Sequence, residues 1–210
     1  MAKITAIEVQ KRRPSRRTIY IDGQYVAGVD QEVVHEVGLK VGQEVDAEKL
    51  AETLSAEEVR SAKESALILL DYRARTRREL ERRLHQKGYT EDVIAKVLDK
   101  LENIDLIDDE RFAANWVASQ LSHRPMGRSR MIWELRKKGV APEIADEALD
   151  QVDKEQEFEL ALNLAERKLG DAALENPETK RKLTGFLRRR GFSWEAISGV
   201  LNKLAMKIEN

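Results

Sequence analysis

The sequence predicts a mostly α-helical protein, in which three tandem three-helix repeats form an elongated, curved solenoid after a small N-terminal extension that contains a β-hairpin. Three observations lead to this fold class. Apolar residues recur at helical spacing along most of the chain, one sequence pattern occurs three times, and strand-like stretches surround a two-residue turn near the N-terminus. We place the extension at residues 1–62 and the repeats at 63–108, 109–154 and 155–210.

The N-terminal extension begins with two stretches that are typical of β-strands, KITAIEVQ from Lys3 and RTIYIDGQYVAGV from Arg17. Within the second stretch, Asp22 and Gly23 have the composition of a two-residue hairpin turn. A turn at this place predicts two cross-strand pairs, Tyr20 with Tyr25 and Ile19 with Val26.

Short helices and a basic segment complete the extension. Asp30 is expected to cap a helix that ends near Gly38, and Asp46 is expected to cap another. Between the first two strands lies QKRRPSRR, which is either an ordinary solvated loop or a basic finger for a polyanion. Such a finger would present Lys11, Arg12, Arg13, Arg16 and Arg17.

One pattern then repeats about every fifty residues without a gap. RRELERRLHQKGYTEDVIAKVLDKL begins at Arg77, RSRMIWELRKKGVAPEIADEALDQV at Arg128, and KRKLTGFLRRRGFSWEAISGVLNKL at Lys180. One shared column holds Gly88, Gly139 and Gly191. Because glycine adopts the left-handed conformation after a last helical turn without side-chain strain, each pattern predicts a helix, a glycine turn and a second helix.

A further apolar helix precedes each pair and completes a three-helix unit. These helices are ESALILLDYR, DERFAANWVASQL and EQEFELALNLAERKL. After the glycine turn, Thr90 and Ser193 stand at N-cap positions, and Pro142 stands one position later, where its missing N–H is harmless. Loops of different length, such as 122–127, join the first helix of a unit to the second.

Charge alternates along the chain although the net charge is only -1. Basic stretches at 72–88, 124–138 and 180–190 alternate with acidic stretches at 89–123 and 139–170. Cations in a last helical turn gain about 0.3–1 kcal/mol from the helix dipole, which is one explanation of the basic stretches. Their excess begins more than one turn earlier, however, and a basic helix in each of three repeats favours a positive stripe that binds a phosphate backbone.

Other residue types give weaker signals. All three tryptophans could stack on nucleic-acid bases. Trp116 and Trp133 fall on apolar helical faces and are better explained as core residues, whereas Trp194 starts a helix and is expected to be exposed. The acidic residues around the first junction could ligate a divalent metal; they are Glu102, Asp105, Asp108, Asp109 and Glu110. The last three are better explained as the cap and first turn of the next helix. The three histidines are scattered, so we expect neither a metal site nor a catalytic histidine.

Several function classes are disfavoured by the composition. The chain has no cysteine, which excludes disulfides, thiolate metal sites and thiol catalysis. No phosphate-cradling loop, nucleophile elbow or zinc-ligand spacing is present, no apolar run approaches the roughly 20 residues that span a bilayer, and the start MAKITAIEVQ does not resemble a signal peptide. We expect a cytoplasmic, monomeric binding protein without cofactor, and not an enzyme.

The sequence resembles the RecX family, bacterial regulators of the RecA recombinase, over nearly its whole length. The resemblance lies in LLDYRARTRREL from Leu69, the glycine turn KGY, LIDDERFA from Leu106, and ELRKKGV from Glu134. The N-terminal strand pair resembles the extension of longer members. The third repeat, with its insert ALENPETKR, resembles the family less closely than the other two.

The resemblance implies a regulator that binds RecA filaments on single-stranded DNA and modulates, most simply inhibits, ATP hydrolysis and strand exchange in recombination, DNA repair and the SOS response. Weak, salt-dependent binding to single-stranded and double-stranded DNA would accompany it. From charge and position as much as from the family, the expected RecA- and DNA-binding residues are Arg73, Arg75, Arg82, Arg83, Arg124, Arg128, Arg130, Lys137, Lys138, Arg188 and Arg189. The alternative is a sequence-independent architectural DNA-binding protein with no RecA partner.

Overall fold

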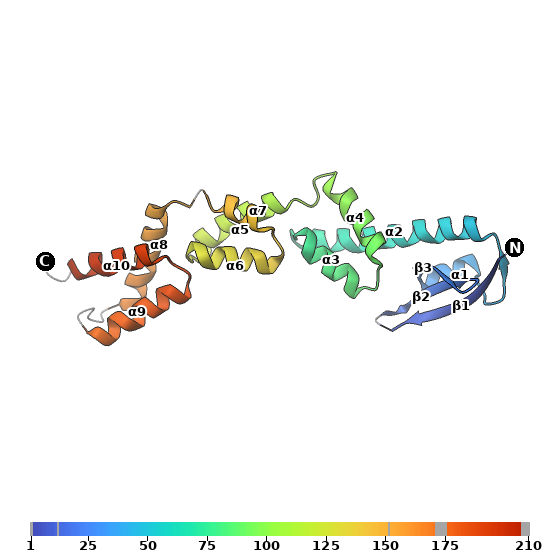
Figure 1. Ribbon diagram of the computed structural model, residues 1–210, viewed down its shortest axis with the longest axis horizontal. Coiled ribbons are helices and arrows are strands. Elements are labelled where there is room, and N and C mark those ends of the chain that lie inside the picture. The colour runs from blue at the N-terminus through green and yellow to red at the C-terminus, as the bar shows by residue number, and fades with distance from the viewer. Residues whose placement is uncertain (1, 12, 151, 171–175, 207–210) are drawn as a thin grey trace. The chain divides into compact units, whose positions relative to one another are not determined.

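The computed structural model describes residues 2–11, 13–150, 152–170 and 176–206, and Figure 1 shows their helices and strands. The chain divides into two compact units, residues 1–108 and 109–210. The first unit contains β1 (Ala2–Gln10), β2 (Arg13–Ile21), β3 (Gln24–Asp30), α1 (Gln31–Val37), β4 (Glu44–Val45), α2 (Ala47–Tyr72), α3 (Arg77–Gln86) and α4 (Glu91–Glu102). The second contains α5 (Asp109–His123), α6 (Arg128–Lys138), α7 (Pro142–Ala148), α8 (Lys154–Leu169), α9 (Pro177–Arg189) and α10 (Trp194–Met206). The prediction of a mostly helical protein with three-helix repeats and a small strand region is confirmed.

The strands form an antiparallel sheet in the order β3-β2-β1-β4. Asp22 and Gly23 have φ angles of 49° and 81°, so the predicted hairpin turn is confirmed, as is the pair Tyr20–Tyr25. The predicted pair Ile19–Val26 is wrong. A register shift between Ile19 and Tyr20 places Ile19 opposite Ala27, because one extra residue is accommodated in β3.

The helices that follow the hairpin begin near the predicted aspartates. Asp30 occupies the N-cap position of α1, but its carboxylate makes no capping bond, because it accepts a hydrogen bond from Ser61 Oγ at 3.0 Å. Gly38 ends α1 with a φ of 69°, as predicted. Asp46 does cap the next helix, since its side chain accepts from the backbone N–H of Lys49 at 3.2 Å.

Helix α2 is continuous where the sequence suggested separate helices. Its 26 residues run through the predicted boundary at residue 62. The early part of α2 packs Leu54 into the core of the sheet, and the later part packs Ala62 and Ala66 into the core of the first repeat. The extension and the first repeat therefore share one helix and form one unit.

Each repeat has a core built around its middle and last helices. The paired leucine or methionine positions of the repeated pattern are almost fully buried: Leu80 and Leu84, Met131 and Leu135, Leu183 and Leu187. Gly88, Gly139 and Gly191 have φ angles of 84°, 92° and 83°. The predicted glycine turns are thus confirmed in all three repeats.

The second and third repeats are joined by specific contacts within the second unit. The backbone N–H of Gly127 donates to the carbonyl of Arg190 at 3.0 Å. The Glu157 carboxylate accepts from the backbone N–H of Arg128 at 3.3 Å and from the Ser193 hydroxyl at 2.8 Å. Gly191 must also lack a side chain, because a Cβ there would overlap the backbone of Arg130. One carboxylate therefore ties the start of α6 to the start of α10.

Candidate nucleic-acid interface

The basic helices are α3, α6 and α9, the middle helices of the three repeats, and each places cations on the face away from its core. Helix α3 is capped by Thr76, whose hydroxyl accepts from the backbone N–H of Glu79 at 3.1 Å. Its buried stripe is formed by Leu80 and Leu84, and Arg82 and Arg83 are exposed between them. Among the described residues neither arginine has an ion-pair partner. Both are available to an anionic ligand.

Arg73 and Arg75 lie at the turn between α2 and α3, where they have structural contacts. Arg73 donates to both carboxylate oxygens of Glu79, at 2.9 and 3.2 Å. Arg75 is 8% exposed and donates from Nε to the carbonyl of Leu69 at 2.9 Å. Burial, followed by the neighbouring Arg73, lowers the pKa of Arg75, although an arginine of this kind stays protonated. Arg75 is therefore placed inside the turn and not on an open surface.

Helix α6 and the residues before it carry five of the expected binding residues. Arg124 is exposed, while Arg128 is half-buried and donates to the carbonyl of Leu149 at 2.5 Å and to Asp150 at 3.2 Å. These two hydrogen bonds of Arg128 hold α6 against the end of α7. Arg130, Lys137 and Lys138 lie further along α6, and Arg130 pairs with Glu134 at 2.6 Å.

Trp133 is a functional candidate on α6 for which the sequence favoured a place in the core over base stacking. Its expected place in the core is wrong, because it is 49% exposed. The core positions of α6 are Met131 and Leu135, and a residue two places from each lies on the opposite face of a 3.6-residue helix. The Arg130 guanidinium carbon lies 4.5 Å and Lys137 Nζ 5.0 Å from the Trp133 ring centroid. An aromatic ring between two cations is a suitable surface for nucleic-acid bases and phosphates.

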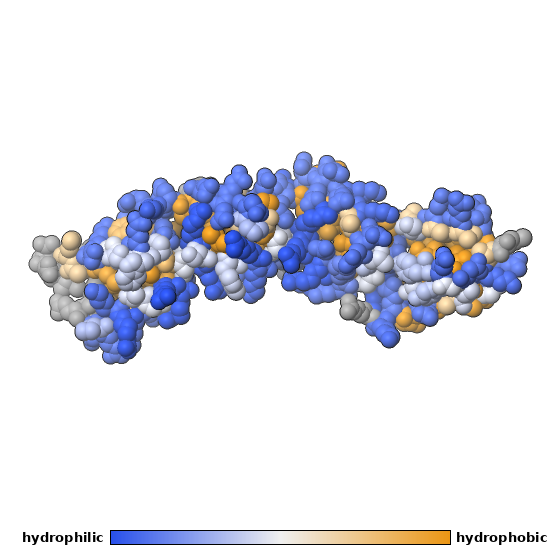
Figure 2. Space-filling view, in the orientation of Figure 1, coloured by the Kyte–Doolittle hydropathy of each residue, from blue (hydrophilic) through white to orange (hydrophobic). Residues whose placement is uncertain are grey.

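The other two tryptophans behave as expected. Trp116 packs against the core of the second repeat, and Trp194 is 69% exposed at the start of α10. On α9, Arg188 and Arg189 are exposed, whereas Leu187 beside them is buried. Figure 2 shows that hydrophilic residues cover most of the visible face of the chain.

The expected basic finger is wrong as an exposed loop, because Arg13, Arg16 and Arg17 are part of strand β2. Lys11 is exposed, and Arg12 lies outside the described residues. Arg17 donates to the Pro14 carbonyl and to Gln31, both at 2.6 Å, so it is occupied by neighbours. Strand β2 lies between β1 and β3, which leaves little of this segment available as a finger.

Arg16 shows the largest departure from the finger hypothesis, since it is fully buried. Its guanidinium donates to the Gly28 carbonyl and to the Glu58 carboxylate at 3.0 Å, and its Cζ lies 4.0 Å from the Tyr89 ring centroid. Burial raises the pKa of Glu58, against the opposing effects of the Gly28 N–H and Arg16. Burial, with help from Glu58, raises the pKa of Tyr25 to about 12. These residues join the sheet to the first repeat and are not a surface site.

The acidic run at the start of the second repeat has the predicted helical role. Asp109 and Glu110 lie in the first turn of α5. No group of three or more potential metal ligands occurs within the parts of the chain that the structure describes. Within those same parts, no helix is both long and apolar enough to cross a membrane.

The fold and surface together define a class of helical-repeat protein, with a cationic helix in each three-helix repeat and a strand-containing extension. Comparisons with known proteins specify the family. Four RecX models match in order: the RecX N-terminal domain at 2–46 and the first, second and third RecX three-helix domains at 62–101, 108–149 and 155–201. The chain belongs to the RecX family of regulatory proteins.

Similar proteins agree over nearly the whole chain. Regulatory protein RecX of Clostridium tetani is 35% identical over 96% of this chain and 94% of its own length. RecX of Clostridium botulinum strain Eklund 17B is 32% identical over 97% of this chain and 96% of its own. A crystal structure of regulatory protein RecX has a TM-score of 0.68 at 30% identity, and covers 96% of this chain and 100% of that one. RecX from Lactobacillus salivarius has a TM-score of 0.65 at 27% identity, over 72% of this chain and 99% of that one.

Proposed function

We propose that this protein binds RecA filaments on single-stranded DNA and inhibits RecA-catalysed ATP hydrolysis and strand exchange. The observation that carries the proposal is the ordered match of four RecX family models along the chain. The family is one of regulatory proteins. The proposed action is therefore binding, in the cytoplasm, without a cofactor.

The basic helices are the proposed contact residues. Their exposed or half-exposed cations are Arg82, Arg83, Arg124, Arg130, Lys137, Lys138, Arg188 and Arg189. Cations on exposed helical faces attract a phosphate backbone without reading its sequence, and their effect falls with salt. Arg130 keeps its place in this set although it pairs with Glu134, because that pair lies on the exposed face of its own helix. Arg73 and Arg128 share their charge with carboxylates of other segments and are proposed as weaker contributors. Buried Arg16 and Arg75 are left out of the proposed surface.

Co-sedimentation with RecA filaments tests this function. The purified chain is mixed with RecA from the same source, single-stranded DNA and a slowly hydrolysed ATP analogue, and the bound fraction is compared with that on bare DNA. Tighter binding to the filament supports the proposal. Equal binding to bare and RecA-coated DNA would instead favour an architectural DNA-binding protein with no recombinase partner.

A matched pair of variants tests the role of the basic helices. Arg82→Glu with Arg83→Glu reverses two exposed charges on α3, while Lys96→Glu with Lys100→Glu reverses two exposed charges on the neighbouring α4. Both variants change the net charge equally and lie in the same unit. Filament binding should fall in the α3 variant and stay close to the parent in the α4 variant. Equal losses would show that only total charge matters.

A further inference from the structure

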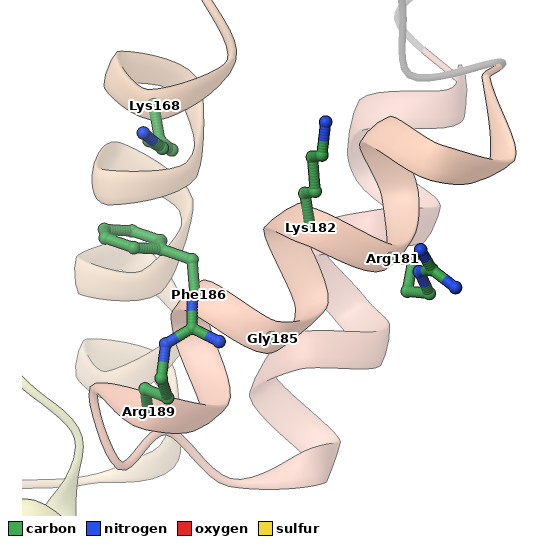
Figure 3. A pocket seen from close by; sticks show the side chains of 6 residues that line it. All are labelled: Lys168, Arg181, Lys182, Gly185, Phe186 and Arg189. Carbon is green, nitrogen blue, oxygen red and sulfur yellow. The ribbon is translucent and has the colours of Figure 1, made fainter.

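The third repeat contains a cationic pocket that lies partly outside the residues discussed above. It occupies about 550 Å³ between α8 and α9, opens to solvent, and is shown in Figure 3. Its lining consists of Lys168, Arg181, Lys182, Gly185, Phe186 and Arg189. No lining residue is acidic, and Glu178 pairs with Lys182 at 2.8 Å from outside the lining. Within the described parts of the chain, the other lining cations have no ion-pair partner.

An aromatic ring forms one wall of this pocket. Phe186 packs partly against the core of the third repeat, and its ring is directed toward α8 in Figure 3. Cations gather around it: the Arg190 guanidinium carbon lies 5.3 Å and Lys168 Nζ 5.9 Å from the ring centroid. Both cations are exposed, so their side chains are available to a ligand that contacts the ring.

Gly185 keeps the floor of the pocket open. It lies inside helix α9, where glycine is less favourable than alanine. A Cβ at this position would approach Arg189 Nη1 to 3.2 Å. Figure 3 shows Gly185 between the side chains of Lys182 and Arg189. Glycine at this position therefore lowers the stability of the helix but leaves space beside Lys182 and Arg189.

We propose that this pocket binds one nucleotide of a single-stranded nucleic acid, with the base against Phe186 and the adjoining phosphates beside Lys168, Lys182 and Arg189. A base stacks on an aromatic side chain only when it is unpaired, which favours a single strand over a duplex. The volume lies within the range of ligand pockets, and an open mouth lets a continuous strand enter and leave. The proposal rests on the proposed function only in taking nucleic acid as a partner.

Oligonucleotide binding tests this pocket in the full-length protein. Fluorescence anisotropy of a labelled oligo-dT is measured for the parent, Phe186→Leu and Lys168→Gln. Lys203→Gln is the matched control, because Lys203 Nζ lies 5.2 Å from the Phe158 ring centroid in the same repeat but outside the pocket. We expect Phe186→Leu to weaken binding about fivefold or more, and Lys203→Gln to change it less than about twofold. A Phe186→Leu protein that binds like the parent would overturn the proposal.

Two further measurements keep the test independent of folding. Gly185→Ala retains Phe186 and favours the helix, so it should weaken oligonucleotide binding while the melting temperature stays equal or rises. Ultraviolet crosslinking of a 5-iodouracil oligonucleotide should label a peptide that contains Phe186. A crosslink confined to other repeats would contradict the pocket. Unlabelled ATP and unlabelled oligo-dT are also compared as competitors. If ATP competes as strongly as oligo-dT, the pocket binds a free nucleotide and not a strand, which would refute the assignment.

The pocket and the proposed function can fail separately. If the variants lose oligonucleotide binding while the parent leaves RecA activity unchanged, the pocket stands and the proposed function does not. If the variants bind oligo-dT like the parent while the parent still alters RecA activity, the function stands and the pocket does not.

Discussion

Replacement of Glu58 should destabilise the first unit selectively, because its carboxylate is buried and has three hydrogen-bond partners, two of which are buried as well. Glu58 is 2% exposed, pairs with the fully buried Arg16 at 3.0 Å, and accepts from the Gly28 N–H at 3.0 Å and from the Tyr25 hydroxyl at 3.3 Å. In Glu58→Leu the Arg16 charge stays buried without a carboxylate to neutralise it, which costs about 3–5 kcal/mol. The unsatisfied Gly28 N–H adds about 1–3 kcal/mol.

The expected loss is large compared with the stability of a whole domain, which is typically about 5–15 kcal/mol. Glu58→Gln should cost less, since its amide oxygen can still accept from the Gly28 N–H although the ion pair is lost. The control is Glu64→Leu, further along α2, where an exposed pair with Arg60 contributes little to stability.

The two units can be followed separately in one denaturant titration. All four tyrosines lie in residues 1–108, and all three tryptophans lie in residues 109–210. In Glu58→Leu, the transition seen by tyrosine absorbance should move to lower denaturant, while the transition seen by tryptophan fluorescence should stay in place. A tyrosine transition no lower than that of Glu64→Leu would refute the importance of the buried pair. Equal shifts of both transitions would show that the units unfold together.

Three other predictions concern the basic helices and Tyr25. Arg130→Gln should weaken filament and DNA binding about as much as Lys137→Gln with Lys138→Gln. If these cations only compensate the helix dipole, binding should not change, and melting curves should show a loss of stability in the lysine variant alone. For each phosphate contact, the log affinity for bare duplex should fall by about 0.9 per tenfold increase in salt concentration. An affinity that is the same at low and high salt would contradict phosphate contacts. The pKa of Tyr25 is raised to about 12 from 10.0 in the folded protein. The stability that its protonated hydroxyl contributes is therefore fully present below pH 10 and is lost as the pH rises toward 12. Tyr25→Phe should reduce that loss of stability. Melting curves of the parent and the variant at alkaline pH test this, and an equal dependence on pH in the two proteins would contradict it.

The repeats could be predicted from the sequence because their signals are local. Gly88, Gly139 and Gly191 each end a helix through the conformation of one residue, which needs no distant partner. Trp133 could also have been placed correctly, because its position relative to Met131 and Leu135 puts it on the opposite helical face. The apolar face of α6 is the one that carries Met131 and Leu135, and Trp133 does not lie on it.

Other features depend on contacts between residues far apart in the chain. Arg16 appeared to be part of a basic finger because its partner Glu58 lies 42 residues away on another element. Strand β4 has two residues, too few for an alternating pattern, and exists because Ala2 and Lys3 pair with it. The continuity of α2 likewise depends on its simultaneous packing against the sheet and the first repeat.

The DNA-dependent ATP hydrolysis of RecA is the most direct test of the proposed function. RecA from the same source is assembled on single-stranded DNA, and the hydrolysis rate is followed while the chain is added well below one molecule per RecA subunit. Inhibition should appear at these low ratios and should be weaker for Arg82→Glu with Arg83→Glu than for Lys96→Glu with Lys100→Glu. A hydrolysis rate that stays unchanged up to equimolar protein, with active RecA and folded chain, would contradict the function proposed for this protein.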